Sequence, residues 1–407
     1  MRIVQRSAWI LLLAASFLLL PVRSVRAAEP VEILKEEISY SFGDELVFDL
    51  TVDGVEDIER VDLILQTPGL PGFSGSMRIS ASGTLFFSYD LEQRPLPAFA
   101  PVTYSYRFVA GDGSETTTEP KSFTYLDNRF NWQKLEEDPF IIYWYEGDLP
   151  FAREVLDAAQ AGTTEILDLL QQPESTEPVQ VFVYSSQDAL QTTLISTNQS
   201  WVAGHAAPEL GSAVVSLPPG VDQSLEIQRQ IPHEIAHIMI YRYMGAEYRY
   251  LPAWVSEGIA SLMENYNRPE YNVLLENAVR DRALIPLSQL CNVFPTDPDL
   301  VQLSYAESYS ILNYIREEYG VTGVQALIAA YDQGVSCDRG VEIALGKNLT
   351  QLERNWKQES FFRVRNLLII GGLSLILLLL LAGIAWIVVR KDFKKDPKTP
   401  EELWKEK

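Results

Sequence analysis

Residues 367–389 form a run of 23 residues without a charged side chain, and this run restricts the architecture more than any other feature. As an α-helix with a rise of 1.5 Å per residue it would be ~35 Å long, enough to cross a ~30 Å hydrocarbon core. The alternative, a buried helix in a water-soluble core, would normally keep a polar face. We therefore predict one C-terminal transmembrane helix.

Residues 1–28 have the layout of a secretory signal peptide. Arg2 and Arg6 precede an apolar run, and small residues near the end of the segment offer a cleavage site. An uncleaved anchor is the alternative, although the run is shorter than the ~20 residues of a span. A secreted N-terminus predicts a single-pass protein of the cell membrane, with residues 29–362 extracytoplasmic and the tail, residues 390–407, cytoplasmic. The tail begins with a basic cluster, as the positive-inside rule expects: Arg390, Lys391, Lys394 and Lys395.

The acidic balance of the chain excludes one class of partner. The formal net charge is −22, and residues 29–389 carry −28 because both ends of the chain are positive. A surface this acidic is unsuited to nucleic acid, so we expect no nucleic-acid partner. The sequence does not indicate an oligomeric state.

The chain has two cysteines, Cys291 and Cys337, and both fall in the part that we expect to be exported. A disulfide would suit an oxidising compartment, but the sequence alone does not require the pairing. Two thiols are too few for a cysteine-based zinc site.

The part between the two apolar segments divides into two domains. Residues 29–128 contain short alternating or β-branched runs separated by Pro-Gly and Gly-Asp-Gly turns, which predicts a β-sandwich-like domain. Residues 129–139 read as a linker. Residues 140–362 begin with a mixture of predicted strands and one helix and then become helical from about residue 224, which predicts an α+β domain.

The string His233-Glu234-Ile235-Ala236-His237 indicates a metal site. Positions i and i+4 of a helix share one face, so both imidazoles can reach one ion, while Glu234 can act as a general base on a water molecule. Pro232 directly precedes the string; it is tolerated in a first turn and kinks a helix interior, but the residues after it remain free to be helical. The alternative is a helix whose paired histidines bind no metal.

Glu257 is the candidate for a third ligand. It lies 20 residues after His237, which leaves room for a helix, a turn and a returning helix that begins near Pro252. A glutamate beside Trp254 and Ile259 is costly to bury unless it is paired or bound to metal. The alternative is a glutamate at the helix edge that faces water.

The two segments together resemble a known family. His233-Glu234-Ile235-Ala236-His237, followed by Trp254-Val255-Ser256-Glu257-Gly258-Ile259-Ala260, is similar to the gluzincin peptidases and most of all to the peptidase MA-like group. Over roughly residues 140–355, the resemblance implies a thermolysin-like zincin domain in which His233, His237 and Glu257 bind Zn²⁺ and Glu234 is the catalytic base. Relatives often carry an acidic residue soon after the glycine to hold a ligand histidine. This chain departs from that pattern, with Ser261 and, further on, Glu264 in that region.

Three weaker candidates are aromatic or imidazole side chains. Tyr305 and Tyr309 are spaced i, i+4 on a predicted helix, where a phenol could stabilise an oxyanion; packing against the core is the alternative. His205 precedes a predicted strand over residues 213–217 and could contact substrate, although a loop histidine with an ordinary hydrogen bond is the simpler expectation. We expect the 213–217 strand to bind an extended peptide by edge pairing.

These features predict a membrane-anchored, extracytoplasmic, zinc-dependent endopeptidase or aminopeptidase-like hydrolase that acts on peptides or proteins. The alternative is a catalytically inactive zincin-fold binding module at the cell surface, and intact Glu234 argues against it because a scaffold needs no base. A membrane sensor that signals through its tail is a third hypothesis, but 18 residues are too few for a domain.

Overall fold

The computed structural model describes residues 31–53, 58–80, 83–173, 175–194, 204–266, 268–362 and 376–387. The predicted signal peptide, residues 1–28, and the predicted cytoplasmic tail lie outside these residues. Of the predicted transmembrane segment, only residues 376–387 are described, as an exposed helix. Among the described residues, no helix combines the length and apolar character that crossing a membrane requires.

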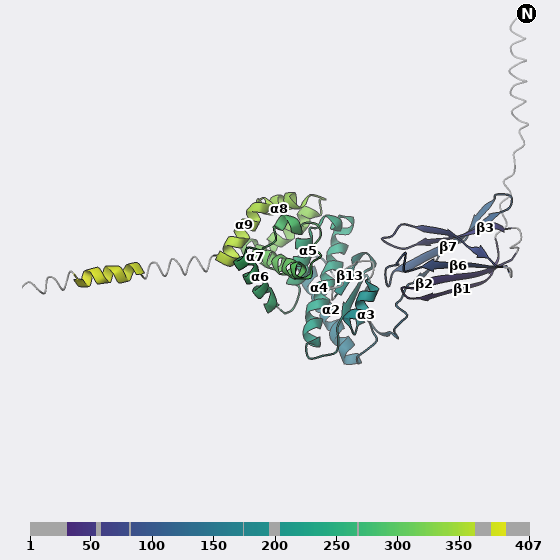
Figure 1. The fold of residues 1–407 in the computed structure, drawn as a ribbon, viewed down its shortest axis with the longest axis horizontal. Coiled ribbons are helices and arrows are strands. Elements are labelled where there is room, and N and C mark those ends of the chain that lie inside the picture. The colour runs from purple at the N-terminus through teal and green to yellow at the C-terminus, as the bar shows by residue number, and fades with distance from the viewer. Residues whose placement is uncertain are drawn as a thin grey trace, which may run out of the picture. The chain divides into compact units, whose positions relative to one another are not determined.

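The chain forms two compact units, which meet in sequence between Arg129 and Phe130 (Figure 1). The first unit confirms the predicted N-terminal β region. One antiparallel sheet has the order β1 (Ile33–Ser41), β2 (Glu45–Val52), β6 (Thr84–Asp90), β5 (Arg78–Ile79). The other has the order β4 (Phe73–Ser76), β3 (Ile58–Gln66), β7 (Pro101–Ala110), β8 (Glu115–Thr117), and β9 (Lys121–Thr124) also pairs with β7.

The two sheets of the first unit share one hydrophobic core. Along β2 the side chains alternate between buried and partly exposed, as the period of two residues in a strand requires. Leu46, Phe48 and Leu50 of β2 are fully buried in one cluster with Leu63 of β3 and Tyr106 of β7. This arrangement is that of a sandwich.

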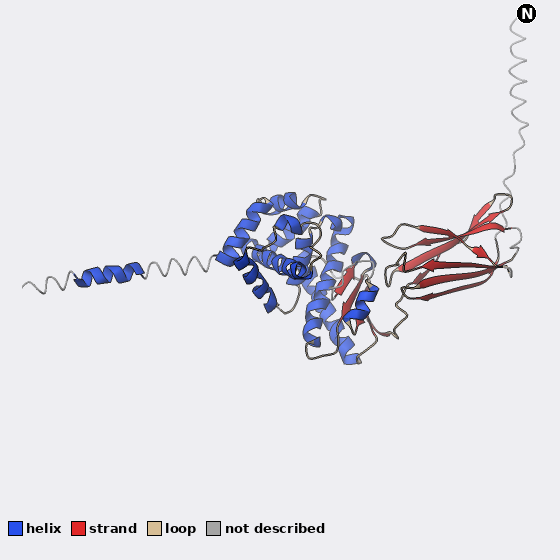
Figure 2. Ribbon diagram, viewed as in Figure 1, coloured by secondary structure: helices blue, strands red, loops and turns tan. Residues whose placement is uncertain are grey.

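The second unit combines one mixed sheet with helices (Figure 2). The sheet order is β10 (Gln133–Glu137), β11 (Phe140–Trp144), β12 (Val179–Tyr184), β14 (Ser212–Ser216), β13 (Gly204–Ala207). The three central strands are parallel and the two outer strands antiparallel to their neighbours. The segment 129–139, predicted as a linker, therefore contributes strand β10 to this sheet; its exposed, charged side chains hide the strand from a pattern-based prediction.

Helices make up the rest of the second unit, in agreement with the predicted α+β class. The longer ones are α2 (Leu149–Leu170), α4 (Gln223–Met244), α5 (Ala253–Leu262), α6 (Pro269–Asp281) and α7 (Pro298–Tyr331). Shorter ones are α3 (Gln187–Thr193), α8 (Cys337–Leu345), α9 (Leu349–Lys357), the 3-10 turns η4 (Pro208–Leu210), η5 (Gly245–Tyr250) and η6 (Leu287–Leu290), and the π-helical turn η7 (Gln358–Phe362).

Two glycines let the helices that carry the candidate site pack closely. A Cβ atom on Gly162 of α2 would lie 2.8 Å from Pro232 Cα, so α2 and α4 meet backbone to backbone. A Cβ atom on Gly258 of α5 would lie 2.6 Å from the carbonyl oxygen of Ser308 on α7. Both contacts exclude any larger residue unless a helix moves. They fix α4 against α2, and α5 against α7.

Glu307 on α7 is a buried carboxyl that makes stability depend on pH. It is 2% exposed, and its Oε1 accepts a 2.9 Å hydrogen bond from the backbone N–H of Ile285. Burial raises the pKa of Glu307 to about 8, against the lowering effects of this hydrogen bond and of Lys357. The folded state thus keeps a proton that the unfolded chain releases at lower pH, so the free energy of unfolding falls as the pH rises from about 5 to 8.

Glu307→Gln keeps the acceptor and removes this titration. Over pH 5 to 8 we expect the free energy of unfolding of the variant to rise by about 3–5 kcal/mol relative to wild type. Urea unfolding at several pH values measures the difference. The exposed Glu276→Gln change is the control and should leave the profile parallel to wild type. Parallel profiles for Glu307→Gln as well would show that Glu307 is ionised in the folded protein.

Candidate metal centre

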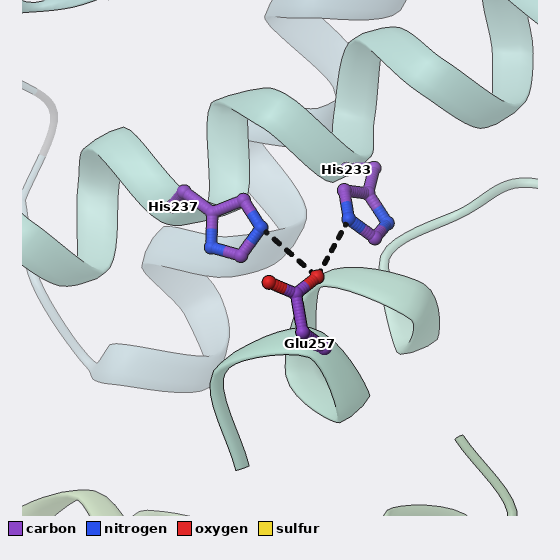
Figure 3. A group of neighbouring side chains, drawn as sticks. All are labelled: His233, His237 and Glu257. Carbon is purple, nitrogen blue, oxygen red and sulfur yellow. Dashed lines mark hydrogen bonds and ion pairs between the residues drawn. The ribbon is translucent and has the colours of Figure 1, made fainter. Parts of the chain in front are cut away.

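His233, His237 and Glu257 converge at one point of the second unit (Figure 3). Helix α4 presents both histidines on one face, and α5 presents the glutamate between them. Glu257 Oε2 lies 3.3 Å from His233 Nε2 and 3.5 Å from His237 Nε2. Two ligand atoms of a tetrahedral zinc site, each about 2.1 Å from the ion, lie about 3.4 Å apart. The spacing and the two-imidazole, one-carboxylate donor set therefore fit Zn²⁺.

The outer nitrogen of His233 is held by a second carboxylate. His233 Nδ1 lies 3.2 Å from Glu264 Oε1, and Arg268 Nε donates a 2.6 Å hydrogen bond to Glu264 Oε2. Burial lowers the pKa of His233, but the hydrogen bonds to Glu257 and Glu264 outweigh it and raise the pKa to about 10. The surrounding carboxylates thus favour positive charge at this point, which is what a cation site requires. Of the two residues that the sequence offered near this point, Ser261 and Glu264, it is Glu264 that contacts His233.

Pro232 helps to explain how Glu264, 31 residues after His233, reaches this histidine. Helix α4 begins at Gln223, so Pro232 lies in the helix interior and cannot donate to the carbonyl of Gln228 four residues earlier. That carbonyl instead accepts a 3.1 Å hydrogen bond from the backbone N–H of Asn265. The side-chain Nδ2 of Asn265 also donates a 2.7 Å hydrogen bond to Gln228 Oε1. These two bonds dock the end of the 263–265 turn on α4 and so place Glu264 against His233.

Removing Glu264 should weaken metal binding without removing a ligand. We expect Glu264→Ala to lower zinc affinity by about 10–100-fold, because outer partners orient ligand histidines and raise their basicity. Glu264→Gln, which keeps a partner for Arg268, should show a smaller loss. Competition with a chromophoric chelator measures the affinity, with Glu276→Ala as control. Equal affinity in wild type and Glu264→Ala would mean that Glu264 does not support His233.

His237 is held by hydroxyl groups instead of a carboxylate. Its Nδ1 lies 3.1 Å from Ser256 Oγ and 3.3 Å from the Tyr248 hydroxyl, and these two oxygens are 3.3 Å apart. Burial raises the pKa of Tyr248, so its phenol is neutral and available as a hydrogen-bond partner. Ser256 directly precedes the ligand Glu257, so one turn of α5 supplies both a ligand and a support.

Glu234 lies in the same cleft, between α4 and strand β13. Glu234 is 7% exposed. Burial raises the pKa of its carboxyl, and the neighbouring His233 and His237 and a hydrogen bond with the backbone of Ala206 act in the opposite direction. A Cβ atom on Gly204 would come within 2.5 Å of Glu234 Oε1. The bare backbone of Gly204 therefore makes room for the carboxylate. A raised pKa and a position beside the metal ligands are the properties of a general base.

The strand predicted to bind peptide is not an edge strand. β14 is hydrogen-bonded to β12 on one side and to β13 on the other, and its side chains are buried. This corrects the expectation for residues 213–217: a peptide has no free edge there. On this side of the described sheet the terminal strand is β13, while β10 is the terminal strand on the other side; residues Gly204 to Ala206 of β13 line the cleft of the metal centre.

The cleft has a volume of about 380 Å³ and contains some of the predicted residues but not all. Tyr305 lines it, with its ring 6.2 Å from that of His233, and burial raises its pKa well above the usual value. His205 also lines it, and burial, with His237, lowers the pKa of its imidazole. Tyr309 does not line this cleft; one turn further along α7, it lies 6.1 Å from Tyr271 and lines a different cavity. The roles of both tyrosines stay predictions.

Residues 159–361 match the family model of the Peptidase MA superfamily. The match includes all three candidate ligands and Glu234, and it supports a zincin-like peptidase of the MA clan for this domain. The narrower assignment to the gluzincins stays a prediction. No curated protein matches the chain.

Three solved structures resemble small parts of the chain. A bromine derivative of BhCBM56 is 17% identical, with 22% of this chain and 88% of that chain covered at a TM-score of 0.18. A family 56 carbohydrate-binding module that binds β-1,3-glucan is 12% identical, with 22% of this chain and 95% of that chain covered at a TM-score of 0.17. A structure described as a myokine is 12% identical, with 24% of this chain and 98% of that chain covered at a TM-score of 0.19. Scores this low carry no argument about fold or function.

Proposed function

We propose that this chain is a zinc-dependent peptidase whose centre is His233, His237 and Glu257. The observation that carries the proposal is the convergence of these three side chains, with Glu234 buried beside them and the Peptidase MA match over the same domain. Zinc bound there would supply a Lewis acid that polarises a carbonyl and activates water. Peptide hydrolysis is the reaction class that this set of groups performs.

The side chains then have separate tasks. Glu234 accepts the proton of the attacking water and delivers it to the leaving nitrogen, for which a partly raised pKa is suited. Tyr305 keeps its proton near neutral pH and donates a hydrogen bond to the developing oxyanion. Strand β13 aligns an extended peptide along the cleft by backbone pairing. Glu264 and the hydroxyls of Ser256 and Tyr248 keep both imidazoles oriented.

Incubating the full-length chain with a mixed peptide library tests the proposal. We expect cleavage that stops with a zinc chelator and returns when Zn²⁺ is added in excess. Undiminished cleavage by protein shown to be free of metal would contradict the proposed mechanism. The ends of the product peptides would also distinguish an endopeptidase from an aminopeptidase.

We further propose that the peptidase domain is extracytoplasmic and anchored by residues 367–389. The proposal is supported by the 23 uncharged residues there and by the signal-like residues 1–28. Protease added outside intact cells should degrade the domain. Its protection until the cells are lysed would contradict this placement.

A further inference from the structure

One wall of the metal cleft is formed by a single short segment whose middle residues are apolar. Residues 292–296, between η6 and α7, line the cleft beside Val301 and Tyr305. Within this segment Val293 is 70% exposed, and it lies next to Phe294 and Pro295, so apolar surface is contiguous along the cleft. Exposed apolar side chains that border a site are typical of a surface that a ligand covers. Asn292 and Thr296 at its ends are polar, and we call the apolar residues between them, Val293, Phe294 and Pro295, the apolar wall.

Both ends of the apolar wall are held in place. At its start, Cys291 forms a disulfide with Cys337 of α8, and its carbonyl accepts a 3.1 Å hydrogen bond from the backbone N–H of Ala253 in the first turn of α5. At its end, the Asp297 side chain caps α7 by accepting from the N–H groups of Asp299 and Leu300. The wall is therefore fixed to the same helix that carries Glu257, and it is formed before substrate arrives.

The wall also touches the reacting region through aromatic packing. The rings of Phe294 and Tyr305 pack edge to face with centroids 5.3 Å apart, and the Tyr305 ring lies 6.2 Å from that of His233. A substrate group against Phe294 would thus lie close to the bond being cleaved. The wall would therefore contact the part of the peptide next to the scissile bond, and not a part far from it.

The charge and polarity of the residues that line the cleft indicate which kind of substrate side chain fits there. Among the described residues that line the cleft, the carboxylates are Glu234 and Glu257, which belong to the metal centre. The apolar wall itself offers no charge to pair with a basic or acidic side chain, and burying an unpaired charge there would be costly. Val293 and the partly exposed Phe294 instead offer area that an apolar side chain can cover.

From these observations we infer that the apolar wall is a specificity subsite for a large apolar side chain, such as Leu, Ile, Phe or Tyr, that flanks the scissile bond of a peptide substrate. The inference rests on the proposed peptidase function. It names residues that determine selectivity, while the residues already described perform the chemistry. The disulfide of Cys291 has the role of keeping the subsite formed.

Two pools of synthetic decapeptides test the subsite. In one pool the variable positions hold Leu, Ile, Phe and Tyr, and in the other they hold Gly, Ser, Asp and Lys. The full-length zinc-loaded chain is expected to cleave the apolar pool at least about tenfold faster, since apolar contacts in a pocket discriminate by about 10–200-fold. Val293→Asp and Phe294→Ala should each reduce this ratio by about tenfold or more.

Val273→Asp is the matched control. Val273 is 58% exposed on α6 and does not line the cleft, so this variant should retain the wild-type ratio. Zinc content and thermal midpoint show that each variant is folded. If the variants cleave but keep the wild-type ratio, or if the wild-type ratio is near one, the subsite inference is overturned while the peptidase function stands. If zinc-loaded wild type cleaves neither pool, the proposed function is overturned and the subsite with it.

Discussion

Glu234→Gln is expected to lower peptide turnover by about 10²–10⁴-fold while zinc remains bound, because the amide cannot accept the proton of the attacking water. Glu234 lies in the cleft but is not one of the three converging ligands, so its loss should leave the donor set intact. Glutamine has nearly the same shape, and the contact with Gly204 therefore places no new demand on packing. Steady-state kinetics and zinc analysis on the same preparation measure both parts of the expectation.

The same variant separates the enzyme from the inactive binding module. A binding module loses nothing when its buried glutamate becomes glutamine, so unchanged function with bound zinc would favour that alternative. Glu276→Gln serves as the control for a change of charge on the same domain, since Glu276 is exposed on α6. A loss of zinc along with turnover would instead place Glu234 among the ligands.

Glu257→Ala is expected to remove most zinc affinity, by more than about 100-fold, and turnover with it. The expected loss exceeds the 10–100-fold effect of an outer partner because a ligand itself is lost. Burial raises the pKa of Glu257, but His237 and His233 together hold it well below its usual range, so the carboxylate is ionised and ready to bind a cation. Zinc titration in competition with a chelator measures the affinity.

Glu276→Ala is the control for Glu257→Ala and should bind zinc as wild type does. A Glu257→Ala protein that retains wild-type affinity would mean that the third ligand comes from elsewhere. Circular dichroism of the metal-free variants shows whether a loss of affinity reflects a loss of fold.

The histidine pair of the candidate metal centre could be predicted from sequence because its geometry is local: an i, i+4 pair on one helix needs no knowledge of tertiary structure. The spacing to Glu257 leaves room for a returning helix but also for a glutamate that faces water, and its choice as a third ligand depends on the resemblance of residues 254–260 to the gluzincins. In the structure the potential ligand atoms of His233, His237 and Glu257 all lie within 4.8 Å of one another. Pro232 can be recognised from sequence as a possible helix breaker. The sequence does not indicate that Asn265 donates to the carbonyl of Gln228, which Pro232 leaves without its usual helical donor.

The supporting residues depend on contacts between distant segments, and the sequence carries little trace of them. Glu264 reaches His233 only because Asn265 docks on α4, and Tyr248 reaches His237 from a 3-10 turn whose direction no periodicity indicates. The expectation of a free strand edge at residues 213–217 is wrong for a similar reason. β13 precedes β14 in sequence yet takes the outer position, which hydrophobic patterns within each strand cannot reveal.

The most direct test of the metal centre is anomalous X-ray diffraction from crystals of the zinc-loaded protein, recorded on both sides of the zinc absorption edge. We expect one strong peak about 2.0–2.2 Å from His233 Nε2, His237 Nε2 and a carboxylate oxygen of Glu257. A zinc peak at another place, or a Glu257 side chain turned away from the two imidazoles, would contradict this expectation.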